Sequence, residues 1–243
     1  MDAKAAAHAF ASELREEFGL ALRSATLFGS AARGEHIAGL SDVNVLLLFT
    51  DINAPTLARA APVVRRHAAE GLNPLPLERE EWERARDVFA IELLDMRDAR
   101  EVLFGADPLD GVEVEPAALR LQAERELRAK LITLHGGLLQ AADSPDAIGE
   151  LLRRALPSFA TYLRTALRLC GEAAPVSTRD AIIAGCERVG AEPEGLLAAL
   201  DARLAPKRRW SVRLEDETVE RYNDAVEKTA TFVDEIQIQE NDR

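Results

Sequence analysis

The sequence has few of the residues that build zinc sites, disulfide frameworks and membrane spans. It contains two cysteines and four histidines, and these form neither a CxxC pair nor an HExxH motif, so no zinc site is expected. Cysteines in such low number indicate free thiols in a reducing cytoplasm. The sequence has no run of about 18 apolar residues, which excludes a membrane span, and residues 1–18 lack the apolar core of a signal peptide.

Aromatic residues and basic charge are also scarce. Aromatic residues make up 5% of the chain, and 42 acidic residues outnumber 30 basic ones, giving a net charge of −12. Non-specific binding to DNA or RNA depends on Lys and Arg that release phosphate counterions, so bulk nucleic acid is not an expected partner. The densest basic cluster, KRRWSVR at 207–213, is expected to be a solvated loop, with contact to a nucleotide tail or RNA as the alternative.

What the sequence does contain is enough apolar residues, 47% of 243, for a sizeable core. In the first half, helical periodicity alternates with short apolar runs rich in branched residues, which predict strands. The strands expected here are 22–28, 42–49, 87–96 and a short edge piece at 74–78, limited by its prolines. The helices expected between and before them are 2–18, 30–34, 55–70 and 80–86.

The second half has a different character, because no strand-like alternation follows residue 96. The helices expected there are 117–142, 145–170, 177–189, one from Pro193, and 215–239. The fold class is therefore α+β: an α/β-type N-terminal domain with a mixed sheet over 1–112, followed by an all-α helical bundle over 113–243. We expect the first two helices of the bundle to pack as an antiparallel pair, because their connection is short.

The segment that best indicates a chemical function is 27–49. A strand leads into Gly29, which has no Cβ to keep a phosphate away from the backbone. Ser30 then opens a helical turn, where its hydroxyl and nearby backbone N–H groups can converge on an anion. Asp42 and Asn44 are two residues apart on the next strand, so both side chains project from one face. That arrangement suits a Mg²⁺ ion that bridges triphosphate oxygens.

These residues resemble the motif of the nucleotidyltransferase superfamily, which includes DNA polymerase beta, aminoglycoside nucleotidyltransferases and the MNT antitoxins. The family has Gly-Ser after a strand and, about a dozen residues later, Asp-hydrophobic-Asp on the next strand. Arg33, Gly34 and Ser41 also match its usual bacterial form. The resemblance covers about residues 22–105 and implies that Gly29, Ser30, Arg33 and Ser41 bind nucleotide. The alternative for Arg33 is a surface pair with Glu35. It also implies a third carboxylate from a later strand, which Glu92 matches best, with Asp95 on the opposite strand face as the alternative.

The chain departs from this family pattern at Asn44, where the family has its second acid. An amide offers one neutral oxygen in place of a carboxylate that can bridge two ions. One hypothesis is a nucleotidyltransferase, attenuated at this ligand, that binds Mg²⁺ through Asp42, Asn44 and Glu92. It would transfer a nucleoside monophosphate from a nucleoside triphosphate to a hydroxyl of a small molecule or protein. The alternative is a catalytically degenerate nucleotide-binding or regulatory module, similar to an antitoxin.

Overall fold

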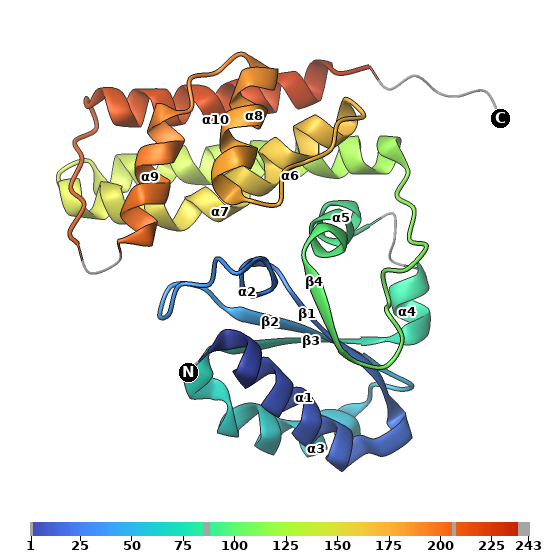
Figure 1. Cartoon of the computed structure of the whole chain (residues 1–243). Coiled ribbons are helices and arrows are strands. Elements are labelled where there is room, and N and C mark those ends of the chain that lie inside the picture. Colours follow the sequence, from blue (N-terminus) through green and yellow to red (C-terminus); the bar gives the residue numbers. More distant parts are fainter. Residues whose placement is uncertain (1, 85–87, 206–207, 238–243) are drawn as a thin grey trace. The chain divides into compact units, whose positions relative to one another are not determined.

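The computed structural model describes residues 2–84, 88–205 and 208–237 (Figure 1). Parts of four expected segments lie outside the described residues: 85–86 of a helix, 87 of a strand, 207 of the basic cluster and 238–239 of the last helix. The chain forms two compact units, Met1–Val114 and Glu115–Arg243. The first contains the sheet and the second is helical in all its regular structure that is described.

The first unit is built on a four-stranded mixed sheet. Its strands are β1 (Leu22–Phe28), β2 (Val43–Phe49), β3 (Leu72–Glu78) and β4 (Arg100–Phe104). Their order is β3-β2-β1-β4, with β2 and β3 parallel and the other two pairs antiparallel. The strands at 22–28 and 42–49 and the edge position of the proline-containing strand are therefore confirmed, as is the α+β class.

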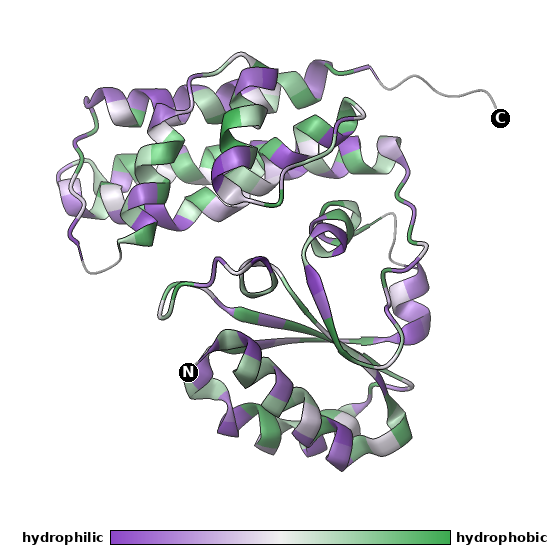
Figure 2. Cartoon of the chain, in the orientation of Figure 1, coloured by the Kyte–Doolittle hydropathy of each residue, from purple (hydrophilic) through white to green (hydrophobic). Residues whose placement is uncertain are grey.

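Helices cover both faces of this sheet (Figure 1). On one face, α1 (Ala3–Phe18) and α3 (Ala54–Arg66) bury an apolar cluster that includes the alternate residues Val43, Val45 and Leu47 of β2. On the other face, the intervening Leu46 and Leu48 pack with α4 (Arg79–Arg84) and α5 (Ala90–Asp98). Because successive side chains of a strand point to opposite faces, an apolar run such as β2 is buried on both sides. Figure 2 shows β2 in green over most of its length.

The prediction of a strand at 87–96 is wrong. Residues Ala90–Asp98 form the helix α5, and the last strand of the sheet is β4, at Arg100–Phe104. Buried residues occur at five of the first seven positions of α5, so its sequence shows an apolar run and not a helical stripe. Such a run does not distinguish a short buried helix from a buried strand. Strand β4 was missed because each of its residues is only partly buried.

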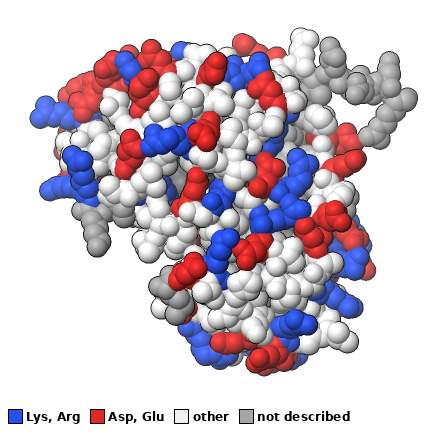
Figure 3. All heavy atoms as spheres, in the orientation of Figure 1, with Lys and Arg blue, Asp and Glu red and all other residues white. Residues whose placement is uncertain are grey.

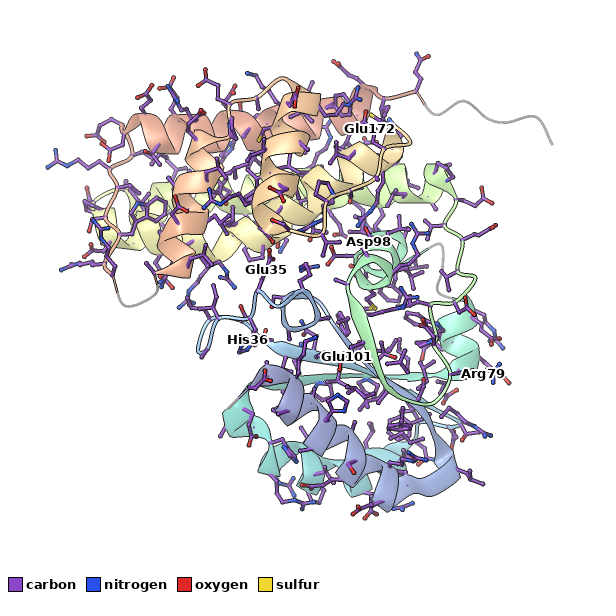
Figure 4. The ribbon with its side chains drawn as sticks, in the orientation of Figure 1. Glu35, His36, Arg79, Asp98, Glu101 and Glu172 are labelled. Carbon is purple, nitrogen blue, oxygen red and sulfur yellow. The ribbon has the colours of Figure 1, made fainter. Side chains whose placement is uncertain are left out.

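Strand β4 is also tied to α1 by side chains. The Glu101 carboxylate accepts a hydrogen bond from Lys4 Nζ at 2.8 Å and pairs with His8 Nε2 at 3.0 Å. The bonds from Lys4, then from His8, hold the pKa of the Glu101 carboxyl below its usual value. Figure 4 labels Glu101 beside α1. The contact fixes the N-terminal helix to the outer strand of the sheet.

The second unit is a bundle of helices close to the expected ones. They are α6 (Pro116–Ala141), α7 (Pro145–Leu169), α8 (Thr178–Val189), α9 (Glu194–Leu204) and α10 (Glu217–Glu235). Prolines stand in the first turns of α6 and α7, and Ser177 caps α8 by accepting a bond from the Asp180 N–H. None of the described helices combines the length and apolar character needed to cross a bilayer.

The core of this bundle centres on Tyr222 of α10, which is fully buried. Its hydroxyl donates to the Leu152 carbonyl at 3.2 Å, and its ring meets that of Phe159 edge-on. The described part of the basic segment, 208–213, is mostly exposed, and Val212 is its one buried residue. Among the described residues on the face drawn in Figure 3, acidic and basic side chains are interleaved.

Candidate functional site

The paired strands β1 and β2 bring the Gly-Ser turn against Asn44. Phe28, the last residue of β1, is the partner of Asn44 across the sheet, so Gly29 follows directly beside it. Gly29 has φ 75° and ψ −148°, a conformation that is essentially restricted to glycine. A Cβ on Gly29 would lie 3.3 Å from Asn44 Nδ2. The turn therefore needs glycine both for its backbone angles and for its approach to the Asn44 amide.

Ser30 begins the short helix α2 (Ser30–Arg33), as expected. The helix is closed by the bond from the Arg33 N–H to the Gly29 carbonyl at 3.0 Å and ends at Gly34 in the left-handed conformation. Ala31 packs into the core, while the Ser30 side chain belongs to a residue that is partly exposed. The turn is thus anchored on one side and accessible on the other.

Asn44 is engaged by a second asparagine that the sequence interpretation missed. Asn73 of β3 stands in register with Asn44 across the parallel pair, and its Nδ2 donates to Asn44 Oδ1 at 2.8 Å. Asn73 is exposed and Asn44 partly buried, so this amide pair faces solvent. The signal was available: Asn44 and Asn73 are each the second residue of a strand, and each is polar among apolar or proline neighbours.

Asp42 precedes β2 and lines a pocket within the first unit. The pocket has a volume of about 390 Å³. Its wall is formed by small residues of α1, by the loop before β2 and by 68–71. Ser41 and Asp42 belong to this wall, and the Ser41 N–H is bonded to the Ile37 carbonyl at 2.8 Å. Figure 4 labels Glu35 and His36 in the loop that leads to them.

Arg33 is held by carboxylates. Its Nη1 donates to Asp95 Oδ2 at 3.2 Å, and its Nε lies 3.7 Å from Glu35 Oε2. The Arg33 side chain is 11% exposed and that of Asp95 is 18% exposed. This pair joins α2 to α5 and positions the turn after β1. A role for Arg33 in nucleotide binding stays a prediction.

Glu92 and Asp95 do not lie on a strand, which corrects the interpretation of both residues. They stand three positions apart on α5 and so share one side of a helix, rather than opposite faces of a strand. The strand position that faces Asn44 is occupied by Asn73. The assignment of Glu92 or Asp95 as a third carboxylate therefore loses the structural reason on which it was based.

The residues at this sheet end do not fit a two-metal magnesium centre. Mg²⁺ is held mainly by carboxylate oxygens, and two ions need carboxylates that bridge them. Here Asn44 supplies an amide where the family has its second acid, and its oxygen already accepts from Asn73. Glu92 stands on the helix α5 and not on a strand beside Asp42 and Asn44. Among residues 2–84, 88–205 and 208–237, no three His, Cys, Asp or Glu side chains gather as a metal-binding group.

The arrangement of elements is similar to that of a solved adenyltransferase. It superposes on spectinomycin adenyltransferase AAD(9) from Enterococcus faecialis, crystallised with ATP and spectinomycin, with a TM-score of 0.56. The match covers 93% of this chain and 97% of that chain at 12% sequence identity. The chain has a nucleotidyltransferase-like fold. No protein-family model and no curated protein sequence matches the chain, so the likeness is one of fold.

Proposed function

We propose that the chain is a nucleoside-triphosphate-binding protein with a nucleotidyltransferase-like fold and a degenerate catalytic centre. The observation that supports the proposal is the turn at Gly29. Its backbone conformation requires glycine, so no Cβ fills the space beside Ser30 and Asn44. Phosphate groups are bound in proteins where backbone and small polar side chains can approach them this closely. The similar adenyltransferase was crystallised with ATP, which supports a nucleotide as the ligand.

The degenerate character follows from the amide pair. Asn44 and Asn73 are neutral and bonded to each other, so the second of the three positions that the resemblance assigns to carboxylates carries no negative charge. Nucleotidyl transfer needs divalent ions that polarise the α-phosphate and neutralise the leaving pyrophosphate. A protein that keeps the glycine turn at Gly29–Ser30, here called the phosphate turn, and lacks a carboxylate at position 44 is suited to sense or store a nucleotide, as a regulatory or interaction module does.

Calorimetric titration of the full chain with ATP and with GTP tests the proposal. We expect at least one nucleotide to bind, and Gly29→Ala to weaken that binding about tenfold or more, or about 1.4 kcal/mol. Gly34→Ala is the matched control, because Gly34 also has a positive φ and a Cβ there would meet no atom within 4 Å. If neither nucleotide binds the wild type, with or without MgCl₂, the proposal is wrong.

Transfer of a nucleoside monophosphate to a hydroxyl acceptor is the second candidate function. It is supported by the fold likeness to spectinomycin adenyltransferase, which extends over 93% of the chain. Pyrophosphate release, measured with Mg-ATP or Mg-GTP and a panel of small-molecule and protein hydroxyl acceptors, separates the two functions. We expect no release above the acceptor-free background; release by the wild type would favour the transferase.

A further inference from the structure

The amide pair of Asn44 and Asn73 differs from the carboxylates of a metal site in its hydrogen-bond donors and in the bond within the pair. An amide has N–H donors, whereas an ionised carboxylate has only acceptors. One amide oxygen of the pair is satisfied internally, because Asn73 Nδ2 donates to Asn44 Oδ1 at 2.8 Å. The donor end of Asn44 remains, and within the described residues it has no hydrogen-bond acceptor.

That donor end points to the phosphate turn. Asn44 Nδ2 lies 3.3 Å from the place that a Cβ on Gly29 would occupy, so it borders the same space that the missing side chain leaves open. The pair is not buried, since Asn73 is exposed and Asn44 partly so. A ligand oxygen can therefore reach the amide from solvent.

We propose that Asn44 donates directly to a phosphate oxygen of the nucleotide, so that the triphosphate binds without a divalent ion. This inference rests on the proposed nucleotide binding and adds how the phosphate is recognised. A carboxylate at position 44 would repel the phosphate unless a cation stood between them. An amide removes that repulsion and supplies an N–H where the cation would be, and Asn73 holds the amide in the required orientation through its bond to Oδ1.

The experiment compares binding of ATP and GTP in EDTA and in excess MgCl₂ for the full chain. For the wild type we expect affinities that differ by less than about threefold between the two buffers. For Asn44→Asp we expect binding in EDTA to fall about tenfold or more and to recover in MgCl₂, because the new carboxylate needs a cation.

Asn53→Asp is the matched control. Asn53 caps α3 beyond the other end of β2 through its oxygen, which an aspartate keeps, and the substitution adds the same single charge. It also removes the bond from the Asn53 amide to Asp51, which lies outside the proposed site. We expect this variant to bind like the wild type in both buffers. Equal ion dependence of the two variants would show that net charge, and not the position at residue 44, controls binding, and would overturn the inference.

The outcomes separate this inference from the proposed function. Wild-type binding that requires MgCl₂ would refute direct recognition by Asn44 and leave nucleotide binding intact. Absence of binding by the wild type in both buffers would refute nucleotide binding itself. If Asn44→Asp binds equally well with and without the ion, the amide does not contact phosphate. Thermal unfolding of each variant without nucleotide shows whether the variant is folded, and Asn44→Ser supplies a neutral replacement if the aspartate variant is not.

Discussion

Replacement of Gly29 by alanine is predicted to destabilise the first unit more than any ordinary left-handed glycine would. At φ 75° and ψ −148°, Gly29 occupies a region that is essentially closed to other residues and costs about 1–3 kcal/mol for a side chain to enter. The added Cβ would also lie 3.3 Å from Asn44 Nδ2, so the amide must shift and strain its bond to Asn73. The expected loss in free energy of unfolding is about 3 kcal/mol.

Gly34→Ala provides the comparison within the same turn. Gly34 has φ 77° and ψ 17°, and a Cβ there has no neighbour within 4 Å, so only the left-handed backbone contributes, about 1 kcal/mol. The difference of about 2 kcal/mol corresponds to about 1 M in the urea midpoint for an m-value of about 2 kcal/mol/M.

Urea unfolding of the first unit can be followed through Trp82. This residue of α4 is 4% exposed, and its Nε1 donates to the Pro108 carbonyl at 2.9 Å, so its fluorescence reports the packing of the sheet. The two alanine substitutions are made in a Trp210→Phe background, which removes the tryptophan of the helical unit. Equal midpoints for the Gly29 and Gly34 variants would refute the argument that Gly29 is required by its backbone angles and its contact with Asn44.

Two further predictions concern titratable groups outside the site. Hydrogen bonds from Lys4 and then His8 lower the pKa of Glu101. The carboxylate therefore stabilises the fold above its unfolded pKa of 4.5 and ceases to do so as the pH falls through the lower folded value. In urea unfolding, Glu101→Gln is expected to cost about 0.5 kcal/mol at pH 7 and almost nothing near pH 3. Burial, then nearby carboxylates, raise the pKa of the Cys186 thiol to about 12. A thiol reagent at pH 8 is therefore expected to modify the partly exposed Cys170 in the native protein and Cys186 only after unfolding. Equal labelling rates for the two cysteines in the native protein would contradict this prediction.

The parts of the fold that the sequence predicts well are those with a local physical signal. Gly19 ends α1 with a positive φ, and Ser177 caps α8 as its hydroxyl and spacing indicate. The apolar run at 42–49 is a strand because both faces of the sheet are covered by helices. In each of these cases the residues that decide the element lie within it or beside it in the chain.

The prediction for residues 87–96 failed because their structure depends on contacts that the local sequence does not reveal. Leu93 and Met96 of α5 pack against the face of the sheet formed by Leu46 and Leu48, and Ala90, Ile91 and Leu94 of the same helix are also buried. A helix that is buried on several sides has no polar stripe, so its periodicity is lost. The neighbouring strand β4 is a sheet edge with partly exposed residues, and it lacks the apolar run that predicts a buried strand.

Prediction of the site is limited in the same way, by contacts between residues far apart in the sequence. The surroundings of Asn44 depend on Asn73, which lies 29 positions away in the chain. Taken alone, Asn44 reads as one weakened metal ligand. In register with Asn73 it becomes half of a neutral pair whose members hold each other at 2.8 Å. Two carboxylates at that separation would repel unless a cation lay between them or one of them took up a proton. Two amides hydrogen-bond and need neither, so this end of the β2–β3 pair forms without an ion. Asn44 could also donate to an aspartate at position 73, but that pair would carry a negative charge that the two asparagines do not. The neutrality of the observed pair favours a site that contacts its ligand directly over an enzyme that has lost a single charge.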